Sequence, residues 1–253
     1  MAGKPEGGAS NRYVSAGVEM YSDNLTITAA LAPYGLIPRG GFVFSGGEDA
    51  PRGVARNRAR SIVLVGHAGS SIWPHFARWW ENEGRDRADP LDNWSKQVLG
   101  EAAEALGARA AFPSDKPWLP FQQWATRAEG LKPSPLGLLI HPVFGLWHAY
   151  RGALLFDEEI EFPAHRAFPH PCDQCAAKPC LSACPVEAFD GAGFAVDRCR
   201  DYLRADVGKA CRTGGCLARL ACPVGREYAY EAAQQRFHMA AFMRAGDRPS
   251  LTA

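Results

Sequence analysis

The placement of the cysteines constrains this chain more than any other feature of its sequence. All eight fall in the stretch 172–223 of a chain of 253 residues, and each half of the stretch ends in a Cys-Pro pair. The first half has the spacing C-x2-C-x4-C-x3-C-P, and the second has one isolated cysteine followed by C-x4-C-x5-C-P. The eight cysteines are Cys172, Cys175, Cys180, Cys184, Cys199, Cys211, Cys216 and Cys222.

The number and spacing of these cysteines predict two iron–sulfur clusters. The first half follows the bacterial ferredoxin run C-x2-C-x2-C-x3-C-P, with two residues added around Lys178-Pro179. Eight thiolates hold two [4Fe-4S] clusters, and in the two-cluster pattern the cysteine before proline binds the other cluster. We therefore predict a crossed arrangement. One cluster takes Cys172, Cys175, Cys180 and Cys222, and the other takes Cys184, Cys199, Cys211 and Cys216.

Two other uses of cysteine stay open as alternatives. Disulfides are typical of small secreted domains, whereas this chain shows no secretory signal and has a size that does not require cross-links. Paired cysteines also bind zinc, but zinc sites usually show two C-x2-C pairs and do not require a Cys-Pro end on each half. A zinc site, or a single cluster, is the main alternative to two clusters.

Charge and hydropathy exclude some classes of protein. The formal net charge is +1, so the sequence shows no basic footprint for nucleic acid. No apolar run reaches the roughly 18 residues that span a bilayer. Unpaired thiols without a secretory signal predict a reducing compartment, the cytoplasm. Residues 1–22 are rich in Gly, Ser and other polar residues, and we expect them to form a disordered leader.

The hydrophobic pattern predicts an α+β fold in two domains. Residues 23–163 alternate between strand and helix patterns and predict an α/β sandwich, while residues 164–253 predict a smaller cluster domain with a closing C-terminal helix. The run 61–66 (SIVLVG) is apolar and rich in β-branched residues, as expected for a strand covered on both faces. The predicted helices cover 24–34, 72–80, 90–107, 118–129 and 227–244. The predicted strands cover 36–44, 61–66, 108–112, 136–142 and 147–156, with the last two paired.

The segment 113–222 resembles the iron–sulfur core of epoxyqueuosine reductases and, more distantly, of corrinoid-dependent reductive dehalogenases. The similarity lies in the order of short motifs ahead of and within the cysteine run. It implies a nitroreductase-like N-terminal domain that holds cobalamin, and a ferredoxin-like domain whose two clusters supply its electrons. The motifs are 127–130 (RAEG), 136–142 (LGLLIHP), 145–148 (GLWH), 152–154 (GAL) and 196–203 (VDRCRDYL), the last of which carries Cys199.

These features leave three hypotheses for function. The first is an electron-transfer protein whose two clusters relay single electrons to a redox partner protein or to the N-terminal domain. The second is a reductase that passes electrons to a corrinoid or a flavin in that domain, with Asp115, His141 or His148 as its candidate general acid. The third is an iron–sulfur sensor or structural protein. The crossed eight-cysteine pattern favours electron relay.

Overall fold

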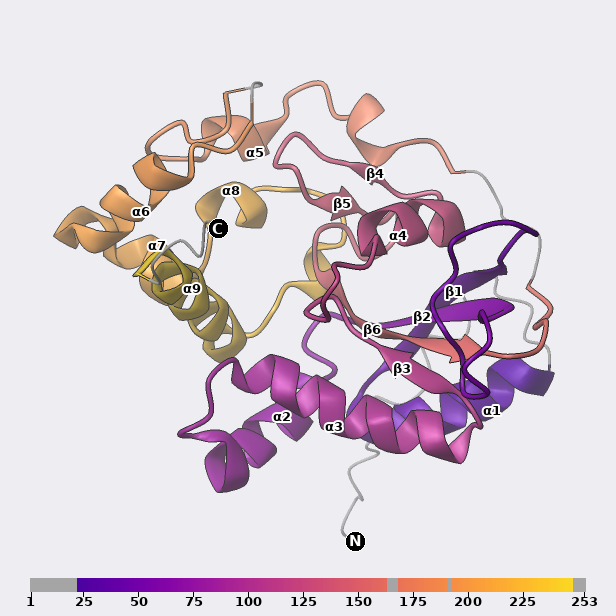
Figure 1. Ribbon diagram of the computed structural model, residues 1–253. Coiled ribbons are helices and arrows are strands. Elements are labelled where there is room, and N and C mark those ends of the chain that lie inside the picture. Colours follow the sequence, from indigo (N-terminus) through magenta and orange to yellow (C-terminus); the bar gives the residue numbers. More distant parts are fainter. Residues whose placement is uncertain (1–21, 163–167, 191–192, 248–253) are drawn as a thin grey trace, which may run out of the picture.

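The structure is a computed structural model that describes residues 22–162, 168–190 and 193–247. The expected leader lies outside these residues apart from Ser22, and the expected domain boundary at 163–164 lies outside them too. Within the described residues the fold is α+β, as predicted (Figure 1). The strands are β1 (Ile37–Val43), β2 (Ser61–Ala68), β3 (Arg109–Ala111), β4 (Lys132–Pro133), β5 (Leu139–Ile140) and β6 (His148–Phe156). The longer helices are α1 (Ser22–Leu31), α2 (Trp73–Trp79), α3 (Pro90–Ala105), α4 (Phe121–Glu129), α6 (Val196–Arg204) and α9 (Ala232–Asp247).

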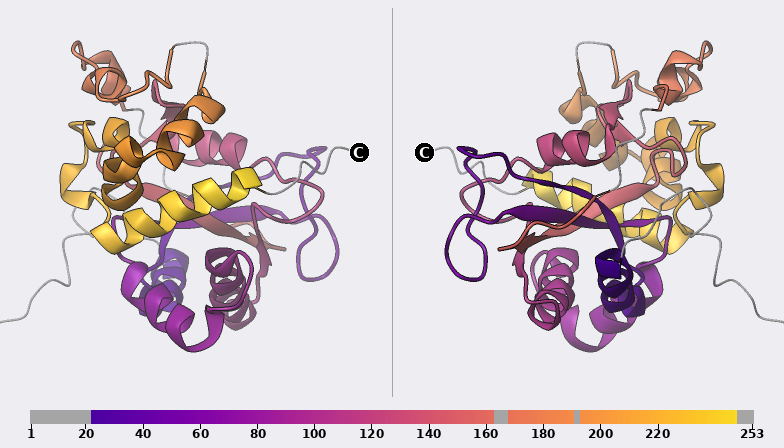
Figure 2. Two further views of the ribbon diagram at one scale, coloured as in Figure 1. Left: turned by 90° about the vertical axis from the view of Figure 1, so that its left-hand side faces the viewer. Right: turned by 90° about the vertical axis from the view of Figure 1, so that its right-hand side faces the viewer.

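The main sheet is antiparallel, with the strand order β1-β2-β6-β3. Every residue of β2 is buried, which confirms the prediction from its β-branched run. Val63 and Val65 pack in a core with α1, α2 and α3. Ile62 and Leu64, which alternate with them, pack in a second core with α4. The sheet therefore lies between two helical layers, as Figure 2 shows.

One predicted strand pairing is wrong. The segments 136–142 and 147–156 do not pair with each other; β6 lies between β2 and β3, and β5 pairs with β4. The segment before β6 cannot form a long strand because Gly137 has a left-handed backbone with φ of 75° and Pro142 lacks a donor N–H. The apolar end of β6 is instead buried in the centre of the sheet.

The cysteine region consists of short helices and turns. Its closing helix α9 begins at Ala232, later than predicted, because a 3₁₀ turn occupies Arg226–Tyr228. No helix in the described ranges combines the length and apolar character needed to cross a membrane. The short elements are η3 (Pro171–Asp173), α5 (Pro179–Ser182), η4 (Asp206–Gly208), α7 (Lys209–Gly214) and α8 (Leu217–Leu220).

Helix α9 crosses back from the cysteine region to the core beneath the sheet (Figure 2). The ring of Phe237 lies 5.1 Å from that of Phe76, 5.2 Å from that of Trp80 and 5.7 Å from that of Trp73. The last helix is thus fixed to helix α2 and the turn after it. The cysteine region and the sheet share part of one core.

Shortening Phe237 to leucine tests this attachment. We expect the variant Phe237→Leu to lose about 1–2 kcal/mol of unfolding free energy, because a buried ring leaves an incompletely filled space. The thermal midpoint by circular dichroism should fall by about 2–8 °C for a chain of this size. Arg236→Ala, at an exposed position of the same helix, should change it little. Equal midpoints for the two variants would show that α9 does not depend on this packing.

Candidate metal centre

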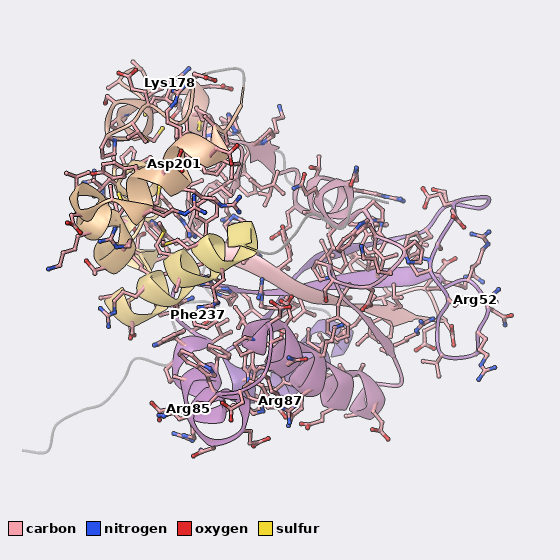
Figure 3. The ribbon with its side chains drawn as sticks, turned by 60° about the vertical axis from the view of Figure 1, so that its left-hand side comes forward. Arg52, Arg85, Arg87, Lys178, Asp201 and Phe237 are labelled. Atoms are coloured by element: carbon pink, nitrogen blue, oxygen red, sulfur yellow. The ribbon has the colours of Figure 1, made fainter. Side chains whose placement is uncertain are left out.

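Two cavities open among the cysteines, and four cysteines line each of them. The space amounts to about 350 Å³ in the first cavity and about 340 Å³ in the second, open solvent included. The sulfur atoms of the region lie around the labelled Lys178 and Asp201 in Figure 3. The two sets are the same two that the spacing groups together, and iron binding by them stays a prediction. The first cavity is lined by Cys172, Cys175, Cys180 and Cys222, and the second by Cys184, Cys199, Cys211 and Cys216.

The residues added to the ferredoxin spacing shape the first cavity. Lys178 has a left-handed backbone with φ of 38°, and Pro179 then starts helix α5, which carries Cys180. Proline suits the first position of a helix because the N–H it lacks would have no partner there. The longer spacing therefore accommodates a turn and a new helix start between the second and third cysteines.

The fourth cysteine of the first cavity comes from the other end of the run. The residues just after Cys222 pack against the turn before β6. A Cβ atom on Gly145, in that turn, would come within 1.9 Å of the Val224 carbonyl oxygen. Gly145 also has a positive φ of 56°, so two features require glycine there. This close backbone contact holds Cys222 beside cysteines far away in sequence.

The second cavity is built from three helices and the end of a fourth. Cys199 lies on α6, Cys211 on α7, and Cys216 immediately before α8. Cys184 follows α5, and its sulfur accepts a hydrogen bond of 3.3 Å from the backbone N–H of Ala188. Such N–H contacts to sulfur stabilise negative charge on a thiolate.

The two cavities are close neighbours. Ala218 of α8 lines the second cavity, and it is also buried in the same apolar cluster as Cys180 and Cys222 of the first. The first turn of α8 thus forms part of the partition between them. A small side chain at this position keeps the partition thin.

Burial raises the pKa of two thiols in each cavity, Cys172 and Cys180 in the first and Cys199 and Cys216 in the second. All eight are free, with no disulfide among them. Burial first, and then the other cysteines of the second cavity, raise the pKa of Cys199 to about 11. Burial and its cavity neighbours raise the pKa of Cys172 in the same way. Thiolates would form in these cavities when a bound metal offsets both effects.

In the described part of the chain, the thiols of each cavity do not converge on a site for one ion. Within residues 22–162, 168–190 and 193–247, no three His, Cys, Asp or Glu side chains are placed to hold one metal ion. A zinc ion requires every thiolate about 2.3 Å from one centre, whereas here the four thiols surround an open space. Cysteine sulfur is the ligand that iron–sulfur clusters use, so the donor set fits a cluster.

The candidate general acids of the N-terminal part do not form one group. Asp115 accepts a hydrogen bond of 2.9 Å from the backbone N–H of Phe112 and pairs with Lys96 at 3.5 Å, as a turn residue does. His141 and His148 do come together, with ring centres 5.8 Å apart. No contact joins Asp115 to either histidine within the described residues.

Both histidines are neutral at neutral pH. Burial, and then the nearby charge of Arg39, lowers the pKa of His141 to about 3 and that of His148 to about 2. His148 Nε2 lies 3.1 Å from the Leu139 carbonyl oxygen and therefore carries the proton. Its Nδ1 accepts from the Arg39 guanidinium at 3.3 Å. These bonds fix the His148 ring in one tautomer.

A buried ion pair next to the histidines was not predicted from the sequence. Arg39 on β1 and Glu129 at the end of α4 make two parallel contacts, Nε–Oε1 at 3.0 Å and Nη2–Oε2 at 3.1 Å. The Tyr150 hydroxyl also donates to Glu129. Arg39 is 2% exposed. The only signal in the sequence is a lone charged residue in a predicted strand.

The chain is thus an α+β protein with two adjacent four-cysteine cavities beside an antiparallel sheet. No protein-family model matches its sequence, and no curated protein matches it either.

Solved structures give weak likenesses in fold. Epoxyqueuosine reductase from Bacillus subtilis has a TM-score of 0.41 and 16% identity, over 69% of this chain and 50% of that one. The enzyme from Streptococcus thermophilus has a TM-score of 0.44 and 16% identity, over 66% and 50%. The chain therefore spans about half the length of these reductases. The C. elegans B12-trafficking protein CblC has a TM-score of 0.49 and 13% identity, over 92% and 97%. At these levels the likenesses carry no argument about function.

Proposed function

We propose that this protein is an iron–sulfur electron-transfer protein with two [4Fe-4S] clusters. The observation that supports the proposal is the division of its eight cysteines into two sets of four around two cavities. In this proposal each set of four thiolates holds one cluster. Bound clusters supply one-electron chemistry. The cysteine region then corresponds to a ferredoxin-like domain, and the sheet with its helices to a nitroreductase-like domain.

The protein's own residues would favour relay between the two sites. The cavities share the partition around Ala218, so electrons would have a short path between them. Burial of Cys180, Cys211 and Cys222 keeps water away from part of each donor set. Exclusion of water and hydrogen bonds to sulfur are the means by which a protein sets cluster potential. A redox partner protein would exchange electrons with one of the two sites.

Anaerobic purification followed by iron and sulfide analysis tests the proposal. We expect about eight irons and about eight sulfides per chain, with a broad absorption band in the blue that bleaches on reduction and returns on reoxidation. The control is the variant in which Cys172 and Cys184 are both replaced by alanine, which should hold no complete cluster. Zinc without sulfide in the unsubstituted protein would contradict the proposal. Cluster loss on every reduction cycle would indicate a sensor or structural role.

A second candidate is a corrinoid- or flavin-dependent reductase. The observation that favours it is the group formed by Arg39, Glu129, Tyr150 and the two histidines, in which Arg39 and His148 are buried. This group adjoins the loop whose Ile140 and Leu146 line the first cavity. A cofactor held there would lie next to one cluster. Sharp corrinoid or flavin bands in the absorption spectrum of the purified protein would establish this candidate, and a spectrum with the cluster band alone would favour electron transfer.

A further inference from the structure

Arg219 lies between the two sets of cysteines. It stands on α8 between Cys216 of the second cavity and Cys222 of the first. Its neighbour Ala218 lines the second cavity. Its guanidinium donates a hydrogen bond to the carbonyl oxygen of Leu146, a residue that lines the first cavity. Figure 1 shows α8 beside α5, which carries Cys180. One cation therefore adjoins the walls of both cavities.

The guanidinium is held in a fixed position by aromatic rings. Its central carbon lies 4.4 Å from the ring centre of Trp147 and 4.5 Å from that of Tyr230. Trp147 and Tyr230 are 2% and 4% exposed, so the arginine has little freedom to move away. The buried Nε of Arg219 has no hydrogen-bond partner. Stacking on aromatic faces is a role that the planar guanidinium fills better than an ammonium.

Among the residues that the structure describes, no carboxylate neutralises the charge of Arg219. No ion pair within the described ranges includes Arg219, whereas Arg39 is paired with Glu129. Its positive charge acts on its surroundings: burial first, and then the charges of Arg151 and Arg219, lower the pKa of His238 to about 3. Water screens a charge in this setting less than one at the surface.

We propose that Arg219 raises the reduction potential of the clusters on either side of it. The inference rests on the proposed function. Each reduction adds one negative charge to a cluster, and a fixed positive charge nearby favours the reduced form. The backbone N–H of Arg219 hydrogen-bonds Cys216, whereas its guanidinium contacts Leu146, Trp147 and Tyr230. The side chain would therefore act on the clusters through its charge, as a positioning residue. Its place between Cys216 and Cys222 lets one side chain act on both clusters.

The test is a redox titration of anaerobically purified variants, followed by electron paramagnetic resonance and absorbance. Arg219→Gln removes the charge, and we expect full iron and sulfide content with potentials shifted to more negative values. Arg219→Lys keeps the charge and should stay closer to the unsubstituted protein. Arg226→Gln is the matched control: Arg226 is exposed and contacts the Cys222 carbonyl oxygen at 3.4 Å. Removing its screened charge should shift the potentials less.

Several results would overturn the inference. Unchanged potentials in Arg219→Gln would do so, and so would an Arg219→Lys shift as large as that of Arg219→Gln, which would indicate packing instead of charge. If Arg219→Gln loses iron, Arg219→Met provides a second neutral variant with an apolar stem, and unchanged potentials in it would have the same meaning. Iron and sulfide missing from the unsubstituted protein would overturn the proposed function, and this inference with it.

Discussion

If the two proposed clusters are present, replacing Cys184 by alanine is expected to remove the one in the second cavity and spare the one in the first. Cys184 stands four residues after Cys180 in the sequence, yet the two cysteines line different cavities. Iron and sulfide should fall from about eight to about four per chain, because a four-iron cluster requires all four thiolates. The measurement is iron and sulfide analysis of anaerobically purified Cys184→Ala, together with the absorbance of the remaining cluster.

Double variants identify which cluster is lost. Cys184→Ala combined with Cys211→Ala should keep about four irons, because both cysteines line the second cavity. Cys184→Ala combined with Cys180→Ala should keep none, although these two are the closer pair in sequence. The opposite result is that the first double variant loses all its iron and the second keeps one cluster. It would assign Cys184 to the first cavity and rule out the crossed arrangement.

Much of the fold could be predicted because local patterns determine it. The run that became β2 has four consecutive apolar residues at 62–65, so apolar side chains point to both faces of the sheet and both faces had to be covered. The helix expected over 90–107 forms as α3, since Leu91, Trp94 and Val98 recur at helical spacing and all three are buried. In each case the residues that define the element are the ones that pack.

Strand pairing was harder to predict because it depends on contacts distant in sequence. The pairing of the two segments around Gly145 looked local, yet β6 joins β2 and β3 instead. The covered faces of β2 required a neighbour with a long apolar run, and β6 provides it through Ala153, Leu154 and Leu155. A local hairpin would have left this run without its burial between two helical layers.

The candidate site, too, could be predicted where local spacing determines it, and could not be predicted where it depends on contacts distant in sequence. Cysteine spacing alone grouped the eight thiols as the two cavities do, because a Cys-Pro step directs the chain away from its nearest neighbours. Arg39 and Glu129 lie 90 residues apart, and no spacing rule connects them. The position of Arg219 could not be predicted either, since its partners Leu146, Trp147 and Tyr230 contact it only in the folded chain.

Replacing Glu129 by glutamine is expected to destabilise the fold strongly. The side chains of Arg39 and Glu129 are 1% and 14% exposed, so the substitution leaves a buried guanidinium without its counter-charge. Breaking one side of such a buried pair typically costs about 3–5 kcal/mol. The thermal midpoint of Glu129→Gln should therefore fall by about 6–20 °C. Circular dichroism on heating measures the change.

An exposed ion pair is the matched control. Arg204 and Asp201 have side chains that are 51% and 74% exposed and pair at 3.1 Å, and Asp201→Asn should change stability by no more than about 1 kcal/mol. The double variant Arg39→Met with Glu129→Leu removes both charges, so it should be more stable than Glu129→Gln, because no unpaired charge stays buried. Were Glu129→Gln as stable as Asp201→Asn, the Arg39 charge would have to be neutralised by some other group. Partial recovery of stability in the double variant would instead show that the stability lost in Glu129→Gln comes from the unpaired Arg39 guanidinium between the sheet and helix α4.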